Sequence, residues 1–190
     1  GKGFFFGGLF EENHLLEDFL AALALARALE VEMATLQKMA KKLKSPELRF
    51  EKMVKNEILF VKDCYNASEA SMEAALENLP MVAGRKIAVL GEMKELGAFS
   101  KKCHKKIGKK AFRYADLLLC LGREGRLMAE AFQEEKEKTE KSGQQVFKQA
   151  FWFEDQKELA LFLKSRMQKG DLVLVKGSRS MAMEKIFDWL

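Results

Sequence analysis

The sequence predicts an α/β fold, with a mostly parallel sheet of about five to six strands covered by helices on both faces. Two observations predict it. From about residue 57 onward, short apolar runs alternate with stretches of helical periodicity, which is the pattern of repeated βαβ units. In addition, the apolar run 87–90 stops abruptly at Gly91, as a buried parallel strand does where it passes into a loop at the edge of a sheet.

The first part of the chain is predicted to be a helical hairpin. Apolar residues recur at helical spacing over 15–29, and a second helix is expected over about 32–43. Ser45-Pro46 should end the hairpin, because the residue before a proline is disfavoured in the α region. The Phe- and Gly-rich segment 1–10 is interpreted as the tail of a strand.

The other elements are expected in regular alternation, and the change of pattern predicts a domain boundary between residues 48 and 49. Strands are expected at 49–54, 57–65, 86–90, 117–121, 146–151 and 172–175. Helices are expected at 68–79, 100–115, 123–137, 154–167 and 178–190.

Composition narrows the class of protein. With 48% hydrophobic residues, the chain can bury one good core, or one core and a smaller annex. Of the net charge of +5, residues 1–48 carry −1 and the rest +6, and this mildly basic second part suits an anionic ligand or no ligand at all. No apolar run is long enough for a membrane span and no secretory signal is visible, so we expect a cytoplasmic protein. Three cysteines without metal-ligand spacing predict free thiols and no metal site.

Polar residues follow several predicted strands, where the carboxyl ends of parallel strands meet at one edge of the sheet. In Lys176-Gly177-Ser178-Arg179, the glycine permits close approach of the backbone, Ser178 can cap the predicted last helix, and its free N–H groups favour an anion. An ordinary capped turn with a surface arginine fits this motif equally well.

Two further residues are candidates for nucleotide contacts. Asp63 ends an apolar strand, so it could accept ribose hydroxyls or simply cap the next turn. Arg49 lies where the two predicted domains join, so it could clamp a phosphate or be a plain surface arginine. No Gly-Lys-Thr/Ser phosphate loop is present in the sequence, so these residues could supply only part of a triphosphate site.

The predicted helix 100–115 is rich in lysine. Its lysine pairs fall on the faces left by the apolar stripe of Cys103, Ile107 and Ala111, which predicts a solvated surface rather than a nucleic-acid site. His104 is expected on the flank of that stripe, where a lone histidine is weak evidence for catalysis.

Four motifs then carry a family resemblance. They are Asp63-Cys64-Tyr65-Asn66-Ala67, the segment VLGEMKELG at 89–97, His104 with Gly108, and Lys176-Gly177-Ser178-Arg179 followed by Met183-Glu184. In this order they resemble the C-terminal portion of the Mur ligases, most closely the branch that adds D-alanyl-D-alanine. More loosely, 14–22 resembles the end of the family's central ATPase domain, with Asp18 where a nucleotide-contacting amide would stand.

The resemblance implies a Rossmann-like ligase domain at 49–190, preceded at 1–48 by the end of a central ATP-binding domain. It implies an amide ligase that uses ATP and Mg²⁺ to add D-alanyl-D-alanine to UDP-N-acetylmuramoyl-tripeptide through an acyl phosphate, in peptidoglycan synthesis. The phosphate loop is expected upstream, so the isolated chain should be inactive. No catalytic residue and no metal ligand is assigned. The implied ATP or phosphate side comprises Arg49, Asp63, Asn66 and Asp18, and the implied dipeptide side Ser178, Arg179 and Lys176.

Two other interpretations remain open. The chain could be a free-standing nucleotide-binding module without catalysis, or a basic interaction protein that uses its lysine-rich helix. We expect a monomer that binds neither nucleic acid nor membrane, and salt-sensitive binding to DNA or RNA would support the basic interaction protein instead.

Overall fold

The computed structural model describes residues 13–42 and 47–190. Contacts within the chain divide it into two compact units, Gly1–Pro46 and Glu47–Leu190, and each is described by itself. The predicted strand tail at 1–10 and the predicted hairpin end at Ser45-Pro46 lie outside the described residues.

The first unit contains the predicted pair of helices, α1 (Asn13–Ala28) and α2 (Met33–Ala40). The chain reverses between them at Glu30, which adopts a left-handed conformation with φ of 62°. In the part of this unit that the structure describes, only Ala40 is buried. Leu25 and Leu29 are 64% and 70% exposed, because two short helices cannot enclose a core of their own.

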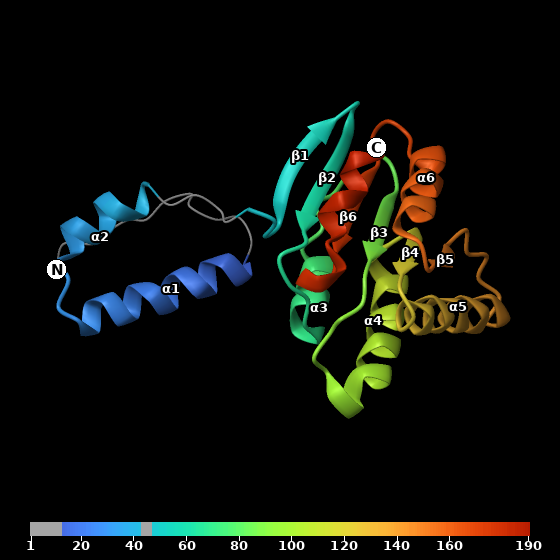
Figure 1. Cartoon of the computed structure of the whole chain (residues 1–190), viewed down its shortest axis with the longest axis horizontal. Helices are drawn as coiled ribbons and strands as arrows, with labels where there is room; N and C mark the ends of the chain where they lie inside the picture. The colour runs from blue at the N-terminus through green and yellow to red at the C-terminus, as the bar shows by residue number, and fades with distance from the viewer. Residues whose placement is uncertain (1–12, 43–46) are drawn as a thin grey trace. The chain divides into compact units, whose positions relative to one another are not determined.

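The second unit is a six-stranded α/β domain (Figure 1). Its strands are β1 (Glu51–Lys55), β2 (Ile58–Asp63), β3 (Lys86–Leu90), β4 (Leu117–Leu121), β5 (Gln149–Phe153) and β6 (Leu172–Lys176). Its helices are α3 (Glu69–Glu77), α4 (Ser100–Tyr114), α5 (Gly125–Lys141) and α6 (Gln156–Arg166), with the short 3-10 segments η1 (Gly97–Phe99), η2 (Arg179–Met181) and η3 (Met183–Asp188).

The strand order is β1-β2-β6-β3-β4-β5, and every neighbouring pair is parallel except β1 with β2. The two antiparallel strands are joined at Asn56 and Glu57, with φ of 54° and 61°. Positive φ at both central residues is the requirement of a two-residue hairpin turn that matches strand twist. The predicted mostly parallel α/β sheet is therefore confirmed, with one antiparallel strand at its edge.

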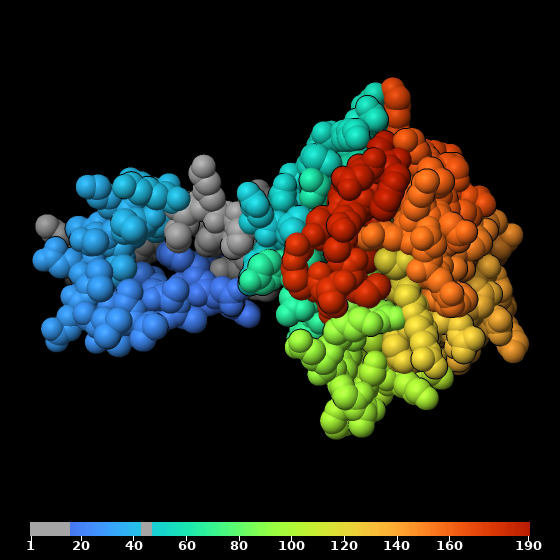
Figure 2. Space-filling model, viewed as in Figure 1, coloured from blue at the N-terminus to red at the C-terminus, as the bar shows by residue number. Residues whose placement is uncertain are grey.

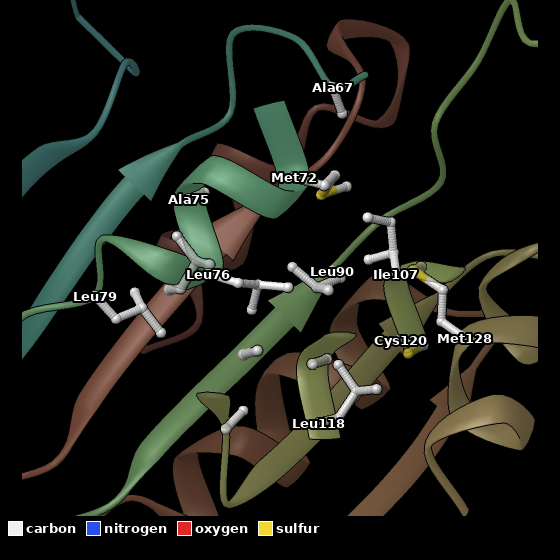
Figure 3. Close-up of a cluster of buried hydrophobic side chains, with 14 of the residues drawn as sticks. Ala67, Met72, Ala75, Leu76, Leu79, Leu90, Ile107, Leu118, Cys120 and Met128 are labelled. Carbon is white, nitrogen blue, oxygen red and sulfur yellow. The ribbon is translucent and has the colours of Figure 1, made fainter. Parts of the chain in front are cut away.

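Both faces of the sheet are buried, as its apolar strands require. Along β3, Ala88 and Leu90 point into a core shared with α3, α4 and α5 (Figure 3), whereas Ile87 and Val89 point into a second core beneath α6 and η3. The alternation follows from the strand period of two residues. The sheet is thus held rigidly between two helical layers.

The structure differs most from the prediction in α5, which runs to Lys141 and not to the predicted 137, in the C-terminal segment and in β5. The expected last helix, 178–190, is broken into η2 and η3 by Ala182, whose φ of 45° is left-handed and interrupts helical hydrogen bonding. This C-terminal segment lies along the surface between the β1–β2 hairpin and α6 (Figure 2). The strand expected at 146–151 is β5, which lies about two residues later because pairing with β4 aligns Leu117 with Gln149.

Within residues 13–42 and 47–190, the structure contains no helix long and apolar enough to cross a membrane.

Candidate functional site

The candidate site lies at the point in the sheet where the order in which strands are added reverses. After β3, β4 and β5 have been added outward with α4 and α5 on one face, the chain returns through α6 on the other face and inserts β6 between β2 and β3. The loops that follow β2, β6 and β3 diverge at that point, and in open α/β sheets ligands bind in such crevices.

Strand register brings the predicted rim residues together. Asp63 at the end of β2 pairs with Lys176 at the end of β6, and Lys176 pairs in turn with Leu90, directly before Gly91. The prediction that the acid, the glycine turn and the Ser178-Arg179 pair share one edge of the sheet is confirmed.

A cavity of about 600 Å³ opens at this edge. Its lining comes from all three loops: Tyr65 and Asn66 follow β2, Lys94 and Glu95 follow β3, and Ser178, Arg179 and Ser180 follow β6. Residues assigned by resemblance to two different sides, such as Asn66 and Arg179, therefore share one cleft.

A buried ion pair lies beneath the cleft. Lys176 Nζ is 2.6 Å from Asp63 Oδ2 and also donates to the carbonyl oxygen of Asn66 at 3.0 Å, and the Lys176 side chain is only 2% exposed. A buried charge is tolerated when it is paired and hydrogen-bonded in this way. Lys176 therefore links the end of β6 to the end of β2 and lies beneath Asn66.

The loop after β3 is anchored by a histidine. The Met93 N–H donates to His104 Nε2 at 3.0 Å, and His104 Nδ1 lies 2.8 Å from the carbonyl oxygen of Ser100, which assigns the proton to Nδ1. His104 is fully buried, so its expected position on the flank of α4 was wrong. It faces the core because the loop supplies the hydrogen bond that makes burial of an imidazole acceptable.

A carboxylate anchors the same loop to its neighbour. Glu92 Oε1 accepts from the Glu124 N–H at 2.8 Å, and Glu92 Oε2 pairs with Lys94 Nζ. Burial disfavours the charged form of Glu92, but the hydrogen bonds from Lys94 and Glu124 outweigh it and hold the pKa of Glu92 below its usual range. Glu92 is therefore an ionised link between the loops after β3 and β4.

Ser178 ties the loop after β6 to the loop after β3. Its Oγ accepts from the Lys94 N–H at 2.8 Å, and its own N–H donates to the Glu92 carbonyl oxygen at 3.0 Å. It makes no side-chain cap to η2, so the predicted capping role was wrong. The loops also touch directly, since a Cβ on Gly177 would lie 3.2 Å from the Gly91 Cα.

Two arginines flank the cleft differently. The Arg49 guanidinium stacks 4.4 Å above the Tyr65 ring, and in the described residues it has no carboxylate partner. Arg179 lines the cleft and pairs with Glu184 at 2.8 Å, although its side chain is 57% exposed.

The remaining sequence candidates lie elsewhere or are already engaged. Asp18 is exposed on α1 in the first unit, and Asn66 Oδ1 accepts from the Ala67 N–H at 2.8 Å. The lysines of α4 form a solvated face, as predicted, and Lys106 pairs with Glu69 and Glu73. Among the described residues, no cluster of three or more His, Cys, Asp or Glu could hold a metal ion.

Sequence reasoning missed the contacts that fix this loop. The sequence does not distinguish Lys94, it marks Glu92 only as a member of the segment 89–97, and it predicts His104 on the flank of its helix. Their spacing in the sequence shows no chemistry of its own, because their partners come from other strands and helices. The available signals are the segment 89–97 and the motif of His104 with Gly108.

Comparison with known proteins agrees with the geometry. Residues 48–179 match the family described as "Mur ligase, glutamate ligase domain". The chain is 30% identical over 177 residues to the UDP-N-acetylmuramoyl-tripeptide--D-alanyl-D-alanine ligase of Treponema pallidum, covering 91% of this chain and 36% of that protein. The Escherichia coli enzyme of the same name is 30% identical over 178 residues, covering 92% and 36%.

Solved structures give the same result. A MurF ligase from Thermotoga maritima in complex with ADP superposes with a TM-score of 0.68 at 28% identity, covering 89% of this chain and 36% of that one. MurF from Acinetobacter baumannii superposes with a TM-score of 0.75 at 26% identity, covering 95% and 38%. The chain thus spans little more than a third of these relatives. Together with the confirmed rim of motif residues, the match shows that this chain belongs to the Mur ligase family.

Proposed function

We propose that this chain is the C-terminal part of a cytoplasmic, ATP-dependent ligase that joins D-alanyl-D-alanine to UDP-N-acetylmuramoyl-tripeptide in peptidoglycan synthesis. The observation that carries the proposal is the cleft between the loops after β2, β3 and β6, which gathers the motif residues of the family. The names of the relatives from T. pallidum and E. coli supply the substrates.

Two residues of the second unit have groups suited to the phosphate and the ribose of a nucleotide. Arg49 offers a guanidinium that has no carboxylate partner among the described residues, which suits a phosphate. Asp63 uses Oδ2 for Lys176, so its second oxygen remains able to accept a hydroxyl. The relative from T. maritima was crystallised with ADP, which supports nucleotide binding in this family.

When bound, ATP with Mg²⁺ would supply the phosphoryl group that turns the tripeptide carboxylate into an acyl phosphate with a leaving group. The Mg²⁺ ligands would come from ATP and from the rest of the enzyme. This chain would contribute position: Ser178 and Lys176 hold the loops around the cleft, and Arg179 would bind the carboxylate of the incoming dipeptide. Asp18 in the first unit would face the nucleotide only in the complete enzyme.

A crossed kinetic experiment tests the assignment. In the complete ligase, we expect Arg49→Ala to raise the KM for ATP and Arg179→Ala to raise the KM for D-alanyl-D-alanine, each roughly tenfold or more. Arg126→Ala is the matched control, because Arg126 lies on α5 in an exposed ion pair with Glu130.

Three outcomes would contradict the proposal. If the complete ligase shows no turnover that depends on D-alanyl-D-alanine, the proposed reaction is rejected. If Arg49→Ala and Arg179→Ala change both KM values equally, the assignment of Arg49 to the nucleotide and of Arg179 to the dipeptide is rejected. ADP release by the 190-residue chain alone would show that the expected need for the rest of the enzyme is wrong.

A further inference from the structure

Glu95 occupies an unusual backbone position at the rim of the cleft. Its φ of 64° lies in the left-handed region, which residues with a side chain rarely adopt. Such conformations persist where the surroundings impose them, and they gather at ligand sites. Glu95 also lines the cleft, so its side chain stands where a ligand would arrive.

The residues before and after Glu95 in the chain hold it in this conformation. Before Glu95, the loop is held by the hydrogen bonds of Glu92, Met93 and Lys94 to the Glu124 N–H, to His104 and to Ser178. After it, Leu96 packs against the core beneath α3 and α4. A loop fixed so tightly holds the Glu95 backbone at the rim of the cleft.

The charges around the cleft favour a ligand with an ammonium group. Lys94 is paired with Glu92 and Arg179 with Glu184, whereas Glu95 has no ion pair or hydrogen bond in the part of the chain that the structure describes. The set therefore carries one excess negative charge, which disfavours a polyphosphate. A ligand ammonium group would neutralise that excess at Glu95, and a carboxylate on the same ligand would share the Arg179 guanidinium with Glu184.

The volume of the cleft also suits a dipeptide. An extended dipeptide spans about 7 Å between its ends, and the cavity of about 600 Å³ holds such a molecule with room for the acceptor carboxylate. The two cleft residues that would contact its ends come from different loops, Glu95 after β3 and Arg179 after β6.

From this geometry we infer that Glu95 binds the ammonium group of the incoming dipeptide and is a specificity-determining residue for a free amino terminus. The inference rests on the proposed function, because it assumes that the cleft receives the dipeptide. It adds the residue that selects and positions the free amino terminus of the dipeptide.

The test uses the complete ligase and the variant Glu95→Gln, which keeps the shape and removes the charge. The KM for D-alanyl-D-alanine should rise roughly tenfold to hundredfold, the usual effect of losing a charged hydrogen bond. The KM values for ATP and for UDP-N-acetylmuramoyl-tripeptide should stay within twofold. Glu130→Gln, an exposed glutamate on α5, should leave all three KM values unchanged.

A second variant separates binding from backbone strain. Glu95→Gly removes the same carboxylate and relieves the left-handed strain, so it should raise or preserve the unfolding midpoint while raising the dipeptide KM as Glu95→Gln does. N-acetyl-D-alanyl-D-alanine, which has no ammonium group, should inhibit the parent ligase and Glu95→Gln with equal inhibition constants.

The results that overturn the inference are distinct from those that overturn the proposed function. If the parent ligase does not turn over with D-alanyl-D-alanine, the proposed function fails and the inference fails with it. If the parent turns over and Glu95→Gln keeps its dipeptide KM, or raises all three KM values alike, only the role of Glu95 is rejected. A weaker inhibition of Glu95→Gln by the acetylated dipeptide would reject it too.

Discussion

Replacing Lys176 by methionine should destabilise the second unit strongly, because Asp63 would remain below the cleft without its partner. The Lys176 side chain is 2% exposed and that of Asp63 is 13% exposed, with 2.6 Å between Nζ and Oδ2. Methionine fills a similar volume, so the variant isolates the loss of charge from the loss of packing.

The magnitude follows from burial. Breaking a buried ion pair by removing one partner costs about 3–5 kcal/mol, and the partial exposure of Asp63 favours the lower end. At about 2–4 °C per kcal/mol for a protein of this size, a loss of about 3 kcal/mol lowers the Tm by roughly 6–12 °C. The double variant Asp63→Asn/Lys176→Met should lose at least about 1 kcal/mol less than the sum of the single variants, since neither charge is left unpaired.

Urea unfolding of the 190-residue chain, monitored by tryptophan fluorescence, measures the loss of unfolding free energy in each single variant and the deviation from additivity in the double variant. Trp152 and Trp189 are the two tryptophans of the chain, and both lie in the second unit. A loss below about 1 kcal/mol for Lys176→Met, or strict additivity in the double variant, would refute the reasoning that this ion pair holds the ends of β2 and β6 together.

Three further outcomes are expected from the fold. Gly108→Ala should cost about 3 kcal/mol in urea unfolding, because its Cβ would lie 2.2 Å from the Met128 carbonyl oxygen where α4 meets α5; an unchanged midpoint would contradict this contact. Burial opposes ionisation of Asp171, but hydrogen bonds from the Arg85 side chain and backbone prevail and lower its pKa. Its stabilisation is thus complete above about pH 4 and is lost as pH falls through the lowered pKa, so Asp171→Asn should be less stable at pH 7 and lose less stability between pH 5 and 3, which unfolding across that range measures. Finally, burial raises the pKa of the Cys64 thiol to about 12, and burial also raises the pKa of the Cys120 thiol. The pKa of the Cys103 thiol is raised mainly by its hydrogen bond to Glu69 and also by burial. No thiol should therefore react rapidly with a disulfide reagent at pH 8 until the chain unfolds, and a fast-reacting thiol would contradict the packing.

Much of the fold was predictable because its signals are local. Short apolar runs bounded by turn residues, such as 87–90 and 172–175, predict strands buried on both faces, and the helices between them show their own periodicity. The terminal segment was not predictable in the same way. Its residues have helical character, but the close packing of Met183 against Gly91 and Gly177 imposes a left-handed turn at Ala182.

The candidate site was also predictable only in part. The sequence by itself determined which residues end the strands, and hence that Asp63, Gly91 and Ser178 share one edge, because parallel strands all present their carboxyl ends to the same side. Only the tertiary structure decided what each group does there. Hydrogen bonds and ion pairs depend on separations of about 3 Å between residues far apart in sequence, and so the structure alone revealed that Lys176 pairs with Asp63, that His104 anchors the loop, and that Glu95 is left facing the cleft without a partner among the described residues.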